Sequence, residues 1–131
     1  MGDFKKLEVW KVAHRVACDV YRATANFPRS EAYGLTAQLR RSAASIPANL
    51  AEGSGRRGDM EFSRFVRISL GSATELEYHL LLSRDVGLLN GTLHSQLSDE
   101  VQRIQGMLAG LNCTLRRRCS RARSQPIAHS L

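Results

Sequence analysis

The sequence YGLTAQLRRSAASIPANLAEGSGRR, residues 33–57, decides the fold, because each face of the helix that it predicts has a different composition. Apolar residues recur at spacings of three and four, which is typical of one buried helix stripe: Leu35, Leu39, Ala43, Ile46 and Leu50. Small residues form a second row, where another helix can approach closely: Ala37, Ala44, Ala48 and Ala51. A helix with so little surface left for solvent predicts protein on most sides, and in a chain of 131 residues this indicates self-association.

A third row of the same helix carries hydrogen-bonding groups at three-and-four spacing: Gln38, Arg41, Ser45, Asn49 and Glu52. We interpret it as a buried polar network that fixes helix register and subunit geometry. If Arg41 and Glu52 are buried, each needs a partner of opposite charge or a hydrogen-bonding group. They pair with each other, with residues of the next helix such as Arg64 or Arg67, or with a neighbouring subunit. The alternative is a contact with a ligand or a nucleic acid.

The rest of the chain continues the helical pattern. Apolar periodicity predicts four helices, at about residues 6–26, 31–53, 59–86 and 92–117. The expected N-caps of the last three are Ser30, Asp59 and either Asn90 or Thr92. Short links and the lack of an alternating strand pattern favour an all-α, antiparallel up-down-up-down four-helix bundle over residues 1–118. Residues 119–131 have no such periodicity, so we predict a flexible basic tail there.

The third predicted helix carries two apolar rows. One is a core row: Phe62, Phe65, Val66, Ser69, Ala73, Leu76 and Leu80. The opposite row would face water in a single chain: Ile68, Gly71, Glu75, Tyr78 and Leu82. An exposed apolar row with a small residue in its middle predicts an oligomer interface, and a homo-oligomeric ring is the assembly that we expect. The alternative is scattered surface hydrophobic residues, which are normal in monomers.

Composition limits the class of protein. The hydrophobic content of 43% is enough for one packed domain without disulfides. Three cysteines without a CxxC pair argue against a disulfide framework or a zinc site. The chain has no signal-peptide core and no apolar run near the roughly 20 residues that span a bilayer, so we expect a cytoplasmic protein without a membrane contact.

Most of the excess positive charge lies near the C-terminus. The formal net charge is +7, and five arginines after residue 115 have no acidic neighbour in sequence. Such a tail binds nucleic acid by neutralising phosphates, or else is simply a solvated terminus. The residues that we predict to contact nucleic acid are Arg40, Arg56, Arg57, Arg116, Arg117 and Arg118.

No group of residues predicts catalysis. Gly53, Gly55 and Gly58 match GxGxxG, but a helix precedes them where the dinucleotide fingerprint needs a strand. We interpret the glycines as a turn; the alternative is a phosphate held by backbone amides at the start of the next helix. His14 and Cys18 lie one turn apart without a third metal ligand. We therefore expect no enzyme activity, no metal and no cofactor.

Three segments resemble a family of four-helix-bundle proteins encoded in intervening sequences of bacterial 23S rRNA genes. They are LEVWKVAHRV (residues 7–16), FPRSEAYGLTAQLRRSAASIPANLAEGSGR (27–56) and FSRFVRISLGSATELEYHL (62–80). The most specific part is SIPANLAEG followed by LGSATELE. The last helix is similar only in its apolar stripe, and the arginine-rich tail has no counterpart in the family.

The resemblance implies a bundle that assembles as a ring, with a homopentamer as the expected count. It also implies distant kinship with the accessory variability determinant proteins of diversity-generating retroelements, which are pentameric bundles that bind nucleic acid and a reverse transcriptase. The family has no established enzyme activity. Nothing in the sequence shows an origin in an rRNA insertion, so a ribosomal role is not carried over.

Together these features predict a non-enzymatic, ring-forming bundle that binds RNA or DNA through arginine-rich surfaces. The expected partners are other copies of the chain and a nucleic acid. The alternative is a protein-interaction scaffold whose ring presents a surface to another polypeptide.

Overall fold

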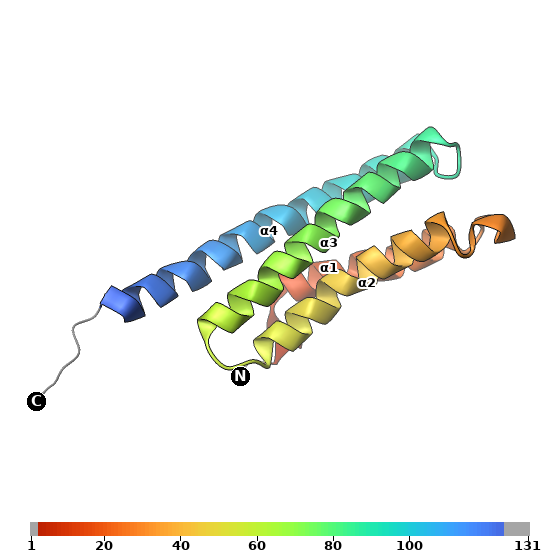
Figure 1. Cartoon of the computed structure of the whole chain (residues 1–131). Coiled ribbons are helices and arrows are strands. Elements are labelled where there is room, and N and C mark those ends of the chain that lie inside the picture. The colour runs from red at the N-terminus through yellow and green to blue at the C-terminus, as the bar shows by residue number, and fades with distance from the viewer. Residues whose placement is uncertain (1–2, 125–131) are drawn as a thin grey trace, which may run out of the picture.

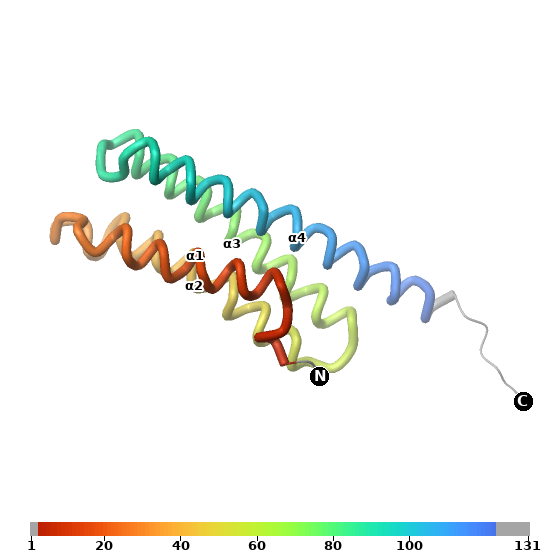
Figure 2. Tube along the Cα trace, turned by 180° about the vertical axis from the view of Figure 1, so that it is seen from behind, coloured from red at the N-terminus to blue at the C-terminus, as the bar shows by residue number. Residues whose placement is uncertain are grey.

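The computed structural model describes residues 3–124 as four long helices and two single 3₁₀ turns. In chain order the elements are η1 Phe4–Lys6, α1 Glu8–Thr24, η2 Arg29–Glu31, α2 Leu35–Ser54, α3 Asp59–Asp85 and α4 Gly91–Ser124. Each helix packs against the next, and α1 also contacts α4 (Figures 1 and 2). The chain is therefore all-α, and its arrangement is consistent with the predicted up-down-up-down bundle. The ring involves several chains and stays a prediction.

Apolar side chains from all four helices form a single core. In α2, Leu39, Ala43, Ile46 and Leu50 are buried, which confirms the predicted core stripe, whereas Leu35 is only partly covered at the start of the helix. Burial of a leucine, isoleucine or valine side chain contributes about 1.5–3 kcal/mol relative to leaving it in water. The apolar stripe of α2 therefore fixes which side of this helix faces inward.

α2 and α3 pack closely at the turn that joins them. A Cβ on Gly53 would lie 2.6 Å from Phe65 Cβ and 3.0 Å from Phe62 Cδ1, so this contact requires a glycine. Farther along the pair, Ser69 Oγ donates a buried hydrogen bond of 2.9 Å to the carbonyl of Ile46. Such a bond contributes about 0.5–1.5 kcal/mol, and it fixes the register of the two helices.

The helix starts differ from the prediction at two of three places. Ser30 lies in η2, and α2 begins only at Leu35, whose N–H is 3.4 Å from Glu31 Oε1. Asp59 is the first residue of α3 and makes no capping bond, because the preceding Gly58 takes the N-cap position with a φ of +85°. At α4 the prediction is confirmed, since Asn90 Oδ1 accepts from the N–H of Leu93 at 2.8 Å.

The end of α4 also corrects the prediction. The helix continues to Ser124, past the predicted end near residue 117, so residues 119–124 are helical where we predicted a flexible tail. Apolar periodicity ends where burial ends, but arginine and alanine sustain a helix without burial. Figure 1 shows this part of α4 running past the connection between α2 and α3. The remainder of the predicted tail, residues 125–131, lies outside the described residues.

None of the helices in residues 3–124 combines the length and the apolar character that a membrane crossing needs.

Gly53→Ala tests the close contact between α2 and α3. The added Cβ would displace Phe65 or Phe62, so we expect the free energy of unfolding to fall by about 1–3 kcal/mol, as for other overpacked sites. Gly110→Ala is the matched control, because its Cβ would meet nothing within 4 Å. It should stabilise the helix by about 0.5–1 kcal/mol. Urea unfolding followed by circular dichroism measures both, and equal midpoints for Gly53→Ala and wild type would refute the contact.

Candidate nucleic-acid interface

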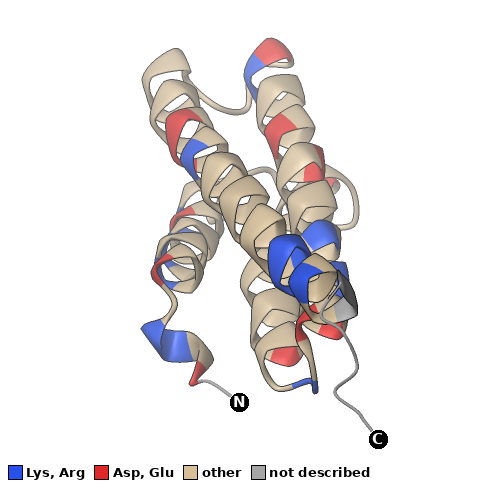
Figure 3. Ribbon diagram, turned by 90° about the vertical axis from the view of Figure 1, so that its left-hand side faces the viewer, with Lys and Arg blue, Asp and Glu red and all other residues tan. Residues whose placement is uncertain are grey.

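Arginines from three segments lie together at one end of the bundle, where α2 turns into α3 and where α4 ends. Arg118 Nη1 is 3.9 Å from Asp59 Oδ1, which places this part of α4 beside the first turn of α3. Figure 3 shows the basic residues around this end of α4. The arginines of the region are Arg56, Arg57, Arg64, Arg67, Arg116, Arg117, Arg118 and Arg121, and its acids are Glu52, Asp59 and Glu61. Cations therefore outnumber acids more than twofold here.

Two of these arginines make exposed ion pairs with an acid that lies three or four residues earlier in the chain. Arg56 is 2.6 Å from Glu52 and lies over the ring of Phe65, while Arg64 is 3.1 Å from Glu61 and lies over the same ring. The hydrogen bond from Arg64 lowers the pKa of Glu61, and the same bond raises the pKa of Arg64. Since water reaches both pairs, a phosphate can replace either carboxylate.

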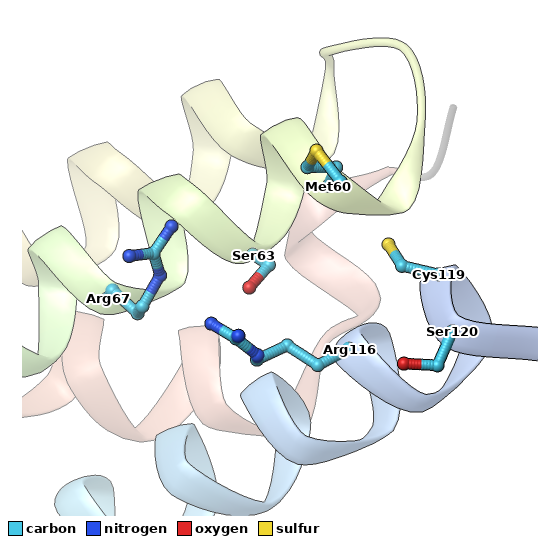
Figure 4. Close-up of a pocket in the computed structure, with 6 residues that line it drawn as sticks. All are labelled: Met60, Ser63, Arg67, Arg116, Cys119 and Ser120. Atoms are coloured by element: carbon cyan, nitrogen blue, oxygen red, sulfur yellow. The ribbon is translucent and has the colours of Figure 1, made fainter. Parts of the chain in front are cut away.

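Two other arginines line a cleft between α3 and α4. The cleft has a volume of about 240 Å³, and its lining is Met60, Ser63, Arg67, Arg116, Cys119 and Ser120. Figure 4 shows Arg116 extending from α4 into the space beside α3, with Ser63 and Arg67 on the facing helix. Within residues 3–124, neither Arg67 nor Arg116 has an ion pair or a hydrogen bond, and no acid lines the cleft.

The structure separates the predicted nucleic-acid contacts into two groups. It brings together Arg56, Arg57, Arg116, Arg117 and Arg118 at the arginine-rich end. Arg117 also donates to Cys113 Sγ at 3.3 Å, a bond that raises the pKa of the arginine. Arg57 has no partner among the described residues.

Arg40 lies away from the arginine-rich end. Its side chain is half-buried near the start of α2 and donates to Thr24 Oγ1 at 2.8 Å and to the Tyr21 carbonyl at 3.3 Å. The guanidinium also lies 4.7 Å from the centre of the Tyr21 ring. Arg40 therefore connects α2 to α1, and the structure gives no support for its predicted contact with nucleic acid.

Sequence reasoning missed Arg67, Ser63 and Ser120 as site residues. The signal was present as a spacing of four between Ser63 and Arg67 on one helix and between Arg116 and Ser120 on another. This spacing places each hydroxyl on the same helix face as an arginine. The sequence does not show that the α3 face with Ser63 and Arg67 lies opposite the α4 face with Arg116 and Ser120, because this depends on how the two helices pack.

Within one chain the polar row of α2 is only partly covered, and its burial in an assembly stays a prediction. Gln38, Arg41 and Glu52 are exposed, while Ser45 and Asn49 are half-buried. The reason is that α3 covers only one edge of the row. The residues that do touch α3 are Ser45, whose hydroxyl is 2.9 Å from that of Ser72, and Arg41.

The two charged residues of this row have separate partners within one chain. Arg41 pairs with Glu75 of α3 and donates to Gln38 Oε1 at 2.7 Å, whereas Glu52 pairs with Arg56. Of the alternatives that the sequence left open, Arg41 and Glu52 do not pair with each other among the described residues, and Arg41 has a partner on α3. The bond from Arg41, and then a 3.2 Å contact with His79, lower the pKa of Glu75.

The predicted interface row of α3 lies on the surface of the single chain. Ile68 is 41% exposed and Tyr78 is 58% exposed, and a Cβ on Gly71 would meet nothing within 4 Å. Leu82 and Glu75 are half-buried at the edge of the row. The exposure of these apolar groups agrees with the expectation for one chain, and their coverage by a second copy stays a prediction.

An apolar groove runs between α1 and α2 on the outside of the bundle. Its volume is about 640 Å³, and its residues include Phe4, Trp10, His14, Cys18, Tyr21, Ala44, Pro47, Ala48 and Ala51. Trp10 stacks on His14 with the ring centres 4.9 Å apart, and Phe4 meets the edge of Trp10. Three of the four small residues of α2, Ala44, Ala48 and Ala51, thus line this groove. No metal-binding group of three or more side chains occurs in the described part of the chain.

Known proteins share this sequence pattern and this fold. Residues 5–110 match the model of a family described as "23S rRNA-intervening sequence protein". The fold is similar to the crystal structure of a protein of unknown function from the S23 ribosomal protein family of Bacteroides thetaiotaomicron VPI-5482. The TM-score is 0.72 at 21% identity, over 79% of this chain and 97% of that chain. The comparison with curated proteins finds no match. The family match ends before Arg116, so the arginines of α4 at the arginine-rich end lie beyond it.

The Arg41–Glu75 pair predicts how the stability of the protein depends on pH. A carboxylate with a lowered pKa contributes stability that is complete above its ordinary pKa of 4.5 and is lost as the pH falls through the lowered value. Glu75→Gln should therefore lower the urea midpoint at pH 7 and have a smaller effect near pH 3. Glu77→Gln is the control, since Glu77 accepts only from the neutral amide of Gln105. Equal pH dependence in the two variants would contradict this assignment.

Proposed function

The chain belongs to the 23S rRNA-intervening sequence protein family, and from this premise we propose that it is a non-enzymatic, self-assembling four-helix bundle that binds RNA or DNA. The binding surface is the arginine-rich end formed by the α2–α3 turn, the start of α3 and the end of α4. The observation that carries the proposal is the set of cations there without acidic partners: Arg57, Arg67 and Arg116. A ribosomal role is not part of the proposal.

The arginines suit a phosphate backbone for physical reasons. A guanidinium presents N–H donors in a planar fork that matches phosphate oxygens. The arginines of the surface are exposed, so a phosphate can approach them without burying an unpaired charge. They come from a turn and two helices that the core holds rigidly, which keeps their relative positions fixed. None of these contacts reads base edges, so the proposal predicts binding with little sequence preference.

Self-assembly is the second part of the proposal. The exposed apolar row of α3 and the apolar groove between α1 and α2 lie on opposite sides of the polar row of α2. In the proposed assembly, the α3 row of one copy enters the groove of the next, where Ala48 and Ala51 permit a close approach. Two different surfaces joined head to tail produce a ring when the rotation closes. Five copies are the proposed count, which rests on the family resemblance.

A double variant, Arg56→Ala with Arg57→Ala, tests the nucleic-acid surface. We expect weaker binding of mixed RNA and DNA oligonucleotides with unchanged helix content. Each lost phosphate contact should also reduce the slope of log affinity against log salt by about one. Fluorescence anisotropy at several salt concentrations measures both quantities.

The matched control is Arg29→Ala with Arg84→Ala, which removes the same charge at the opposite end of the bundle. This variant should keep most of the affinity. Absence of binding by the wild-type protein at low salt would disprove the proposed function, and an equal loss in both double variants would move the surface elsewhere.

Gly71→Glu tests the assembly. A carboxylate in the middle of the α3 row would be buried without a partner at the proposed contact, so the variant should be monomeric and still helical. Gly110→Glu on α4 introduces the same group at another open position and should keep the wild-type mass. Light scattering after size exclusion gives the masses, and assembly of Gly71→Glu at wild-type size would exclude this interface.

A further inference from the structure

We infer that the cleft between α3 and α4 binds a phosphate monoester, the dianionic group at the end of a nucleic-acid strand or on a free nucleotide. The inference rests on the proposed function, because the cleft is one part of the arginine-rich end. It names a specific site within that surface and the charge state of the group that the site takes. Its two central residues are Arg67 and Arg116.

The first argument is uncompensated charge. Arg67 and Arg116 line the same cleft, and neither has a partner within residues 3–124. Other arginines on the same two helices do have acidic partners, as in Arg64 with Glu61 and Arg103 with Glu100. Two cations that share a space without an acid repel one another, and an anion between them removes that repulsion. The cleft is therefore a place where the protein favours negative charge.

The second argument is rigidity. Each arginine follows a buried residue on its helix, since Val66 and Leu115 are at most 1% exposed. At the cleft itself, Ser63 Oγ of α3 donates to Asn112 Oδ1 of α4 at 2.5 Å. These contacts hold the two helices in one register, so the positions from which the arginines extend are fixed before a ligand arrives. Binding therefore requires no movement of the two helices, and only the arginine side chains lose conformational entropy.

The third argument concerns the size and charge of the ligand. A volume of about 240 Å³ is smaller than the 300–1,000 Å³ of ordinary ligand pockets, so the cleft suits one small group with its adjoining sugar. An internal phosphodiester has a nucleoside on both sides and a single charge. A terminal phosphate has one nucleoside and carries about −1.5 to −2 at pH 7, which matches two guanidinium groups. Ser120 adds a hydroxyl to the lining.

The acids nearest the cleft lie outside it. Asp59 is paired with Arg118, and Glu61 is paired with Arg64, so each has a cation of its own. Neither lines the cleft. The interior of the cleft is therefore lined by the two arginines with no carboxylate among the lining residues.

The test compares oligonucleotides that differ only in their ends. Single strands of one sequence with a 5′-phosphate, a 3′-phosphate or two hydroxyl ends are titrated into the full chain, together with inorganic phosphate and adenosine monophosphate. We expect a phosphorylated strand to bind at least about tenfold more tightly than the hydroxyl-ended strand, as for a charge-assisted bond gained. Arg67→Ala and Arg116→Ala should each abolish that preference. Arg116→Lys should restore it only in part, because lysine keeps the charge but not the fork.

Arg103→Ala is the control, since it removes the same charge from an exposed site on α4 and should leave the preference intact. Equal binding of all three strands, with no binding of phosphate or of the nucleotide, would overturn the inference while leaving the proposed function standing. If adenosine monophosphate binds and none of the strands does, the cleft is a site for free nucleotides. The proposed nucleic-acid function is then contradicted, while the inference about the cleft stands. A preference that survives Arg67→Ala and Arg116→Ala would place the phosphate outside this cleft.

Discussion

The contact between α2 and α3 is the constraint on which the rest of the structure depends. At the turn, Gly53 admits Phe65 at a distance that no side chain would allow, and farther along Ser69 bonds to the backbone of α2. Because the two helices cannot slide, the turn that carries Arg56 and Arg57 has a fixed place. The contact with α2 covers one side of α3, so α4 packs against another side. This determines where the arginines of α4 lie beside those of α3.

The sequence predicts the four helices and most of the core, because apolar side chains at three-and-four spacing can be buried in only one way on a helix. It also predicts the exposed row around Gly71, since a second apolar row on one helix has no place in a four-helix core. Helix ends are less predictable. Ser30 and Asp59 have the composition of N-caps, but the turns before α2 and α3 place Gly34 and Gly58 at those positions.

The candidate site was predicted in part. The arginines after residue 115 could be found from charge alone, because they have no acidic neighbour in sequence, and Arg56 and Arg57 from their place beside the glycine turn. Arg67 could not, since its role depends on which residues of α4 lie opposite. For Arg40 and Arg41, the sequence could not show which residues of other helices they contact. Their positions on α2 suggest a nucleic-acid contact and a buried network, yet their actual partners, Tyr21 and Thr24 in one case and Glu75 in the other, come from different helices.

The proposed assembly and the proposed binding surface occupy different parts of the bundle, the apolar row along its side and the arginines at its end. In a ring closed through the sides, the arginine-rich ends of all copies would lie on one rim, where several could hold a single strand and raise its affinity without new contacts. The absolute mass of the native particle, measured with its absorbance ratio at 260 and 280 nm, tests this account most directly. The account predicts a particle of about five times the 14.6 kDa chain mass. A species of 14.6 kDa at all concentrations, with Ile68 and Tyr78 left in water, would contradict it.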